Sequence, residues 1–322
     1  MRILLACVAL LFLATFAPLA LFSIPAPPPE ARLWATPVPL DAERPAKSRL
    51  GALTYLGGWW LRSDDRRFGG ISAIHVEQGD VTALSDAGVR FLFRVPARPG
   101  MAAVAVDPLA EGPGSPRSKR DRDSEAMTVR GNRLWVAFER SNAVWRYDRR
   151  SWRRAASNAP PAMKRWSANS GGEAMVRLDD GRFLIFSERK RRRDGSTEAV
   201  LFDGDPAEAE TAAMKLGYRA PVGYRVTDAA LLPGGRILFL HRRVSILDGL
   251  SAKLTIAALP ELNEGTVLTG AEIAHFEPPT TVDNMEALSV TQEDGRTILW
   301  IASDDNFNPL QRTLLLKFAL AE

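Results

Sequence analysis

Short runs in which apolar and polar residues alternate recur along the chain from about residue 51, and turns that contain glycine separate them. Each copy has a first run that begins with a small or acidic residue, a turn, and a second run that ends in a polar residue. Alternation with a period of two is typical of β-strands, and a glycine turn between two such runs predicts a hairpin. Five copies are clear, and they span residues 69–86, 124–139, 172–188, 227–241 and 285–304.

The spacing of these copies predicts how they are arranged. They start 48 to 58 residues apart, so each interval has room for two further strands, and no interval has the pattern of an amphipathic helix. Four short strands in roughly 50 residues are typical of a propeller blade. We therefore expect an all-β chain folded as a β-propeller of five to six four-stranded blades. A sixth blade, if present, would be degenerate and would lie within residues 96–122 or 189–225.

The last copy lacks a fourth strand. It predicts strands at residues 285–290, 297–302 and 313–319, after which the printed chain stops. Residues 53–60 have the composition of a strand that belongs to none of the copies. We expect this N-terminal strand to complete the last blade and so close the ring, in a propeller domain that spans residues 51–322.

The N-terminal residues predict a targeting segment. Residues 3–22 are an apolar run without Asp, Glu, Lys or Arg, and as a helix they would extend about 30 Å, enough to cross a bilayer. Residues 1–22 are thus a signal peptide or an N-terminal membrane anchor; the run is long for a cleaved signal, and neither interpretation is favoured. We expect a periplasmic or extracellular protein that meets the membrane only through this segment. Residues 23–50 are rich in proline and predict a linker or an extended arm.

Composition narrows the classes of function. The chain is 46% hydrophobic and 25% charged, so it can bury a large core. Its formal net charge is +4, and the densest basic run, residues 189–193, is short and indicates a solvated loop. Without a basic stripe and interleaved aromatics we expect no nucleic-acid partner. Cys7 is the only cysteine and lies in the apolar run, so the domain has neither disulfides nor thiol chemistry, and we expect a monomer.

Polar residues recur where the first strands begin and the second strands end. Adjacent strands of a blade are antiparallel, so both sets of positions are predicted to meet at one mouth of the central channel. The set consists of Glu125, Glu173, Asp228 and Glu286 at the starts, Asp86, Glu139, Glu188, His241 and Asp304 at the ends, and Asp305 and Asn306 beyond the last end.

Clustered carboxylates repel one another unless a cation or an arginine neutralises them. Oxygen ligands without thiols favour a hard ion such as Ca²⁺ or Mg²⁺. Alternatively, the carboxylates cap strand ends and pair with neighbours such as Arg140, Arg189 and Arg243, and the pattern leaves both interpretations open. His241 is the only histidine at the predicted mouth, and Arg242 beside it suits an anionic substrate. The sequence contains no nucleophile elbow, phosphate-binding loop or zinc-protease motif.

Several of these motifs together resemble the bacterial family known for the esterase-like activity of phytase. The similarity covers about residues 52–320 and rests on FGGISA at 68–73, LSD at 84–86, SEAM at 124–127, GEAM at 172–175, SE at 187–188, DNMEAL at 283–288 and SDDNF at 303–307. The resemblance implies a phytase-like propeller with an acidic, calcium-binding mouth that hydrolyses a small-molecule ester or phosphoester.

Two functions follow as hypotheses. In the first, an exported esterase or phosphoesterase uses Ca²⁺ at the acidic mouth, where the cation would lower the pKa of a bound water. Catalysis is assigned to Glu173, Glu188 and His241, substrate contact to Arg242 and Asn306, and cation binding to Asp86, Glu125, Glu139, Asp228, Glu286, Asp304 and Asp305. In the second, the same mouth binds a ligand or a protein without turnover.

Overall fold

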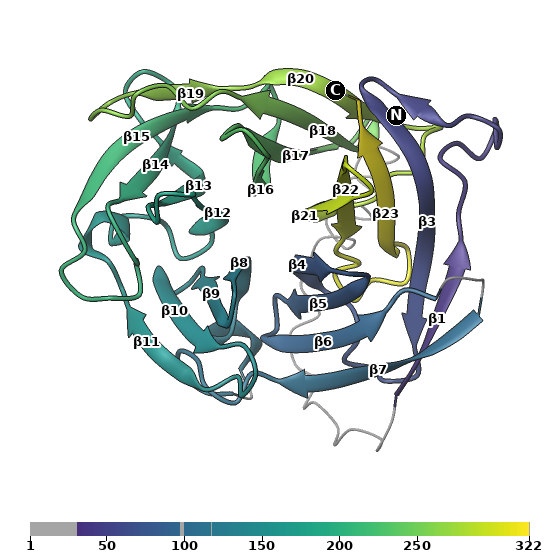
Figure 1. Cartoon of the computed structure of the whole chain (residues 1–322), viewed down its shortest axis with the longest axis horizontal. Coiled ribbons are helices and arrows are strands. Elements are labelled where there is room, and N and C mark those ends of the chain that lie inside the picture. The colour runs from purple at the N-terminus through teal and green to yellow at the C-terminus, as the bar shows by residue number, and fades with distance from the viewer. Residues whose placement is uncertain (1–30, 97–99, 117, 322) are drawn as a thin grey trace, which may run out of the picture.

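Five groups of four antiparallel strands surround a central axis in the computed structural model, which describes residues 31–96, 100–116 and 118–321 (Figure 1). In each group the first strand lies innermost, and the five inner strands β4, β8, β12, β16 and β21 are neighbours around the ring. The all-β propeller predicted from the repeat is therefore confirmed.

The blades follow one another along the chain. Blade 1 contains β4 (Ile71–Glu77), β5 (Asp80–Ser85), β6 (Val89–Arg94) and β7 (Gly100–Pro108). Blade 2 contains β8 (Ser124–Arg130), β9 (Arg133–Phe138), β10 (Ala143–Asp148) and β11 (Arg154–Asn158). Blade 3 contains β12 (Gly172–Arg177), β13 (Phe183–Arg191), β14 (Thr197–Phe202) and β15 (Ala213–Arg219), and β19 (Val267–Thr269) adds to it in parallel.

The last two blades complete the circle. Blade 4 contains β16 (Arg225–Leu231), β17 (Ile237–Ser245), β18 (Gly249–Ala257) and β20 (Ala271–Phe276). Blade 5 contains β21 (Met285–Glu293), β22 (Arg296–Ser303), β23 (Thr313–Leu320) and β3 (Leu53–Ser63). Two short 3-10 helices, η1 (Lys119–Asp121) and η2 (Pro161–Met163), lie between blades.

Ring closure follows the sequence prediction. Strand β3 pairs antiparallel with β23, with Leu53 opposite Leu320 and Leu61 opposite Thr313. A strand from the N-terminal side thus fills the fourth place in the last blade. The intervals considered for a sixth blade, residues 96–122 and 189–225, instead hold β7 and η1, and the outer strands of blade 3.

Residues 31–50 are an arm that pairs with the propeller and not a free linker. Strand β1 (Ala31–Pro37) lies between β3 and β7 and so joins blades 5 and 1 into one ten-stranded sheet, while β2 (Arg49–Leu50) pairs with β3. Leu33 and Leu40 are fully buried. Of the two interpretations of this segment, the structure supports the extended arm for residues 31–50, because their alternating apolar residues pair with a sheet edge.

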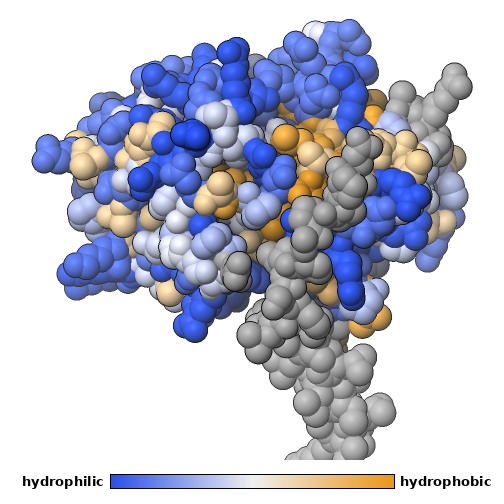
Figure 2. Space-filling view, turned by 90° about the horizontal axis from the view of Figure 1, so that it is seen from below, coloured by the Kyte–Doolittle hydropathy of each residue, from blue (hydrophilic) through white to orange (hydrophobic). Residues whose placement is uncertain are grey.

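The core lies between the blades. Second and third strands such as β14 and β22 are buried on both faces, since each blade packs against two neighbours. Trp135 and Trp300 contribute to this core with only 2% and 3% of their surface exposed. The side of the molecule in Figure 2 is largely hydrophilic, as expected when blade faces are covered. Among the described residues no helix is long and apolar enough to cross a membrane, and the segment predicted at residues 1–22 lies outside them.

Candidate functional site

The start of every inner strand carries a β-bulge. One residue there has no partner on the second strand, and the bulged residues are Ser72, Glu125, Glu173, Thr227 and Glu286. A bulge turns a side chain away from the regular alternation of the strand. Five equivalent bulges therefore set five side chains at one mouth of the channel.

A second set of equivalent positions lies on the second strands, each one residue after the partner of the residue that precedes the bulge. Its members are Asp86, Glu139, Glu188, Arg242 and Asp304. The carboxylates of the two sets interact electrostatically across blades, for example Glu125 with Glu173, and Glu173 with Glu286. The convergence of acidic residues expected from strand direction is thus observed.

Blade 4 departs from the acidic pattern, because its two positions hold Thr227 and Arg242. The sequence prediction placed Asp228 and His241 there and was wrong by one residue in each strand. Asp228 is buried and accepts hydrogen bonds from the backbone nitrogens of Ala229 and Leu288, at 2.8 and 2.7 Å. It joins blade 4 to blade 5 and is no ligand of the mouth.

His241 is fully buried in an aromatic cluster between blades 3 and 4. Its Nε2 hydrogen-bonds the Tyr218 hydroxyl at 2.5 Å, its Nδ1 lies 3.2 Å from the carbonyl oxygen of Lys253, and its ring stacks on that of Tyr218. Burial lowers the pKa of His241 to about 4. The ring packs as an uncharged core residue, so the catalytic role predicted for it has no support in the structure.

Arg242 pairs with the carboxylates on the blade 4 side of the mouth. Its guanidinium lies 2.6 Å from Glu286 Oε1 and 3.8 Å from Glu188 Oε1, and it donates to Asn284 Oδ1 at 2.5 Å. Burial opposes its charge, but Glu286 and Glu188 hold its pKa above the usual value. Glu188 also pairs with Arg225 at 3.2 Å. On this side of the mouth, arginines compensate the carboxylates.

A lysine compensates the blade 1 side. Lys119 Nζ, on η1, lies 2.6 Å from Asp86 Oδ2 and over the ring of Phe307. The other Asp86 oxygen, Oδ1, is buried and has no hydrogen-bond partner. Burial raises the pKa of Asp86, with Asp305 adding to the rise.

The side chains of Asp305 and Asn306 hold the conformation of a loop through hydrogen bonds to protein groups, which does not support the ligand roles predicted for them. Asp305 accepts hydrogen bonds from the backbone nitrogens of Gly70 and Phe307 and from the Thr313 hydroxyl, at 2.9, 3.1 and 2.9 Å. The Asn306 side chain donates to Gln311 at 3.1 Å. Gly70 has a φ of +63°, and a Cβ on it would lie 2.6 Å from the Phe307 ring, so only glycine admits this close approach.

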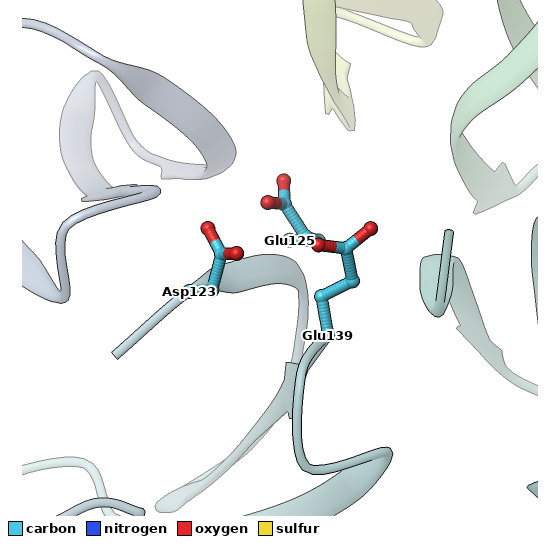
Figure 3. Close-up of side chains that lie close together, drawn as sticks. All are labelled: Asp123, Glu125 and Glu139. Atoms are coloured by element: carbon cyan, nitrogen blue, oxygen red, sulfur yellow. The ribbon is translucent and has the colours of Figure 1, made fainter. Parts of the chain in front are cut away.

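The blade 2 side of the mouth carries the least compensated charge. Asp123, Glu125 and Glu139 each offer a carboxylate oxygen, and these oxygens lie within 4.8 Å of one another (Figure 3). Glu139 also interacts with Glu173 and accepts from the Gly171 nitrogen at 3.3 Å. Arg140 pairs with this group, its Nε lying 3.5 Å from Asp123, and Lys119 acts on Asp123 from a greater distance.

Burial and mutual repulsion raise the pKa values of this group. Burial raises the pKa of Glu139 to about 8, with Asp123 adding to the rise. The pKa values of Glu125 and Glu173 lie well above their usual range for the same reason, Glu173 raising that of Glu125 and Glu188 that of Glu173. Asp304 is affected in the same way by burial and by Asp86. Protons or a cation must therefore neutralise the group when the domain is folded.

The residues fit a hard divalent cation. Three carboxylate oxygens from two adjacent strand ends converge, no thiol or imidazole is among them, and Glu173 lies beside them. Such a set of donors suits Ca²⁺ or Mg²⁺. Of the sequence-predicted ligands, Glu125 and Glu139 belong to this group, whereas Asp86 and Glu286 pair with Lys119 and Arg242.

Sequence reasoning missed three residues of the mouth: Asp123, Lys119 and Asn284. Asp123 directly precedes the first strand of its copy, so its position was a usable signal. Asn284 stands in the DNMEAL motif but was given no role. Lys119 lies outside the repeat, and nothing in the strand pattern connects it with Asp86.

Comparisons with known proteins add a family. A family model described as "Esterase-like activity of phytase" matches residues 66–307. No curated protein matches the chain. Among solved structures, a glutaminyl cyclase from Myxococcus xanthus is 11% identical, with a TM-score of 0.42 over 79% of this chain and 92% of its own. The RS223 β-xylosidase is 12% identical, with a TM-score of 0.45 over 82% and 94%. A gluconolactonase from Xanthomonas campestris is 13% identical, with a TM-score of 0.41 over 91% and 98%.

Proposed function

The chain belongs to the phytase-like family, described by the esterase-like activity of phytase. We propose that it hydrolyses a small-molecule ester or phosphoester at the acidic mouth with the help of a divalent cation, for which Ca²⁺ is the first candidate. The observation that carries this proposal is the cluster of Asp123, Glu125 and Glu139. In the described part of the chain one arginine forms an ion pair with the cluster, and the pKa of Glu139 is raised to about 8. Such a cluster costs folding free energy and is best explained by what it binds.

The three clustered carboxylates would hold the cation. When bound, the cation would supply positive charge to a carbonyl or phosphoryl oxygen and lower the pKa of a water. Glu173 lies beside the cluster and forms no ion pair with a described arginine or lysine. Its raised pKa suits a group that accepts a proton from an attacking water and returns it to the leaving oxygen.

The two compensating cations would orient an anionic substrate. Arg242 lies on the blade 4 side of the mouth and is held by Glu286, whereas Lys119 lies on the blade 1 side and is held by Asp86. Arginine suits bidentate contact with a carboxylate or phosphate, and both groups keep their charge because their carboxylate partners hold their pKa values up. A substrate oxygen held by Lys119 would lie next to the clustered carboxylates of blade 2, since Lys119 interacts electrostatically with Asp123.

Hydrolysis of p-nitrophenyl acetate and p-nitrophenyl phosphate tests the proposal. The full chain should hydrolyse one of them with Ca²⁺ and lose the activity in EDTA. Glu125→Gln and Glu173→Gln should each reduce kcat by at least about a hundredfold, while Glu261→Gln, at an exposed site, should match the wild type. If Ca²⁺ binds to the wild type but neither ester turns over, a ligand-binding propeller replaces the hydrolase. If calcium has no effect on activity or stability, the cation site is refuted.

We further propose that the mouth works outside the cytoplasm, because residues 3–22 have the composition of an export or anchor segment. Fractionation of cells that express the full chain tests this. Recovery in the cytoplasmic fraction would contradict it.

A further inference from the structure

The mouth is flanked on blades 3 and 4 by protruding loops that combine basic and bulky aliphatic side chains. Three segments of the same pole form this rim: residues 188–196, 219–225 and 243–249. They follow from strand direction, because β13 and β17 run toward the mouth, β15 ends there and β16 begins there. We call these three segments the basic rim.

Side-chain contacts join the three segments into one surface. Arg219 donates to the carbonyl oxygen of Asp194 at 3.5 Å, which links the ends of β15 and β13. Arg243 covers the ring of Tyr224 and lies 3.2 Å from Asp248, which links the loop before β16 to the hairpin of β17 and β18. The rim thus extends over blades 3 and 4, which are neighbours in the ring (Figure 1).

The rim exposes aliphatic side chains that do not pack in the core. Seven large hydrophobic residues are exposed in the described part of the chain, and four of them lie here: Val222, Val244, Ile246 and Leu247. Val222 and Leu247 are 98% and 92% exposed. Single exposed aliphatics are ordinary, but a group on protruding loops indicates a surface that meets an apolar partner.

The charge of the same surface is one-sided. The three segments contain eight Arg and Lys residues and three Asp and Glu residues, and Arg191, Arg193 and Arg219 are exposed. Cationic side chains around a protruding aliphatic tip complement an anionic lipid surface, where the tip enters the headgroup region and the arginines contact the headgroups. The one aromatic residue of the rim, Tyr224, is buried, so the surface offers no exposed ring on which a nucleic-acid base could stack.

The path of the chain brings this pole to the membrane. Strand β3 ends at the mouth, because its residue Leu61 pairs with Thr313 at the start of β23. Ser63, two residues further on, is opposite Leu33 of β1. Ala31 therefore lies at the same pole as the basic rim. Only eight residues separate it from the apolar run at residues 3–22, and they span at most about 30 Å.

We propose that the basic rim docks on an anionic lipid bilayer, so that the acidic mouth faces the membrane surface. This contact goes beyond attachment by the N-terminal segment, because it fixes the orientation of the propeller. It is independent of whether the mouth is catalytic.

An environment-sensitive fluorophore tests the orientation in the full chain. It is attached at Leu247→Cys on the rim or at Arg236→Cys, an exposed site in the turn between β16 and β17 at the opposite pole, with Cys7→Ser in both. On vesicles of phosphatidylcholine and phosphatidylglycerol, the label at position 247 should shift to the blue and the label at 236 should not. Vesicles of phosphatidylcholine alone, or high salt, should remove most of the shift.

Charge variants provide the matched control. Arg191→Gln with Arg193→Gln should raise the lipid concentration needed for the half-maximal shift by about tenfold. Arg130→Gln with Arg133→Gln, the same loss of charge at the opposite pole, should leave it unchanged. The proposal is overturned if both labels respond alike, or if the label at 247 stays in water while the chain is bound to the vesicles. The second outcome would indicate that the rim binds a protein partner and not the lipid surface.

Discussion

Without a divalent cation, the propeller should become less stable as the pH rises from 5 to 7, and Glu139 should cause a measurable part of this loss. Burial raises the pKa of Glu139 from 4.5 to about 8. Between these values the folded state holds a proton that the unfolded chain releases, so the free energy of unfolding falls as the pH increases. The contribution of the group is fully present below pH 4.5 and is lost as the pH rises through 8.

The magnitude follows from the same two pKa values. Linkage over pH 5 to 7 gives on the order of 2 kcal/mol for this group, which for a domain of this size lowers Tm by several degrees. Glu139→Gln cannot ionise, so it should lack this part of the pH dependence. Urea unfolding in EDTA at both pH values measures the difference, and Glu261→Gln, at an exposed site, is the matched control.

Calcium should act in the opposite direction. At pH 7 a Ca²⁺ concentration about a hundred times Kd should stabilise the wild type by about 2.7 kcal/mol and Glu139→Gln by much less. Equal pH dependence in the wild type and Glu139→Gln would refute the reasoning, because it would mean that the cluster is not strained by its own charge.

Three further substitutions test separate parts of the structure. Arg242→Met should lower the free energy of unfolding by about 3 to 5 kcal/mol in urea, since it leaves buried carboxylates unpaired, and a loss under 1 kcal/mol would contradict the pairing. Leu33→Ala should cost about 2 to 5 kcal/mol, because β1 is part of the core; an unchanged midpoint would restore the linker interpretation. His241→Gln should reduce stability but leave kcat/KM of any ester hydrolysis within a few-fold, and a loss of a hundredfold would return His241 to the reaction.

The sequence was sufficient for the fold because the physical signals were local and repeated. Alternation with glycine turns predicted each hairpin, and the strand missing from the last copy predicted the pairing of β3 with β23. Strand direction then predicted the acidic mouth. The arm at residues 31–50 was harder, because its prolines indicate a loop as readily as an edge strand.

The errors at the site came from register. A slip of one residue moves a side chain to the other face of a strand, and the acidic Asp228 was placed where Thr227 belongs. The turns after β12 and β16 give the correct register: Leu178 and Leu232 occupy equivalent positions in them, and the bulged residue lies five residues before each. When positions are counted back from these turns, Thr227 and Arg242 of blade 4 correspond to the carboxylates of the other blades. Lys119 lies in irregular structure, and its approach to Asp86 depends on tertiary packing alone.

The β3–β23 pairing also sets the order in which the molecule can be made. Residues 53–63 are synthesised long before their partner strand, Thr313–Leu320. The first strand of the ring must wait until the strands of all five blades have been made, with one edge unpaired and open to aggregation meanwhile. The arm β1 can pair with β7 and β3 during this interval, once residue 108 has emerged. It is therefore suited to protect a nascent chain as well as to join two blades in the finished one.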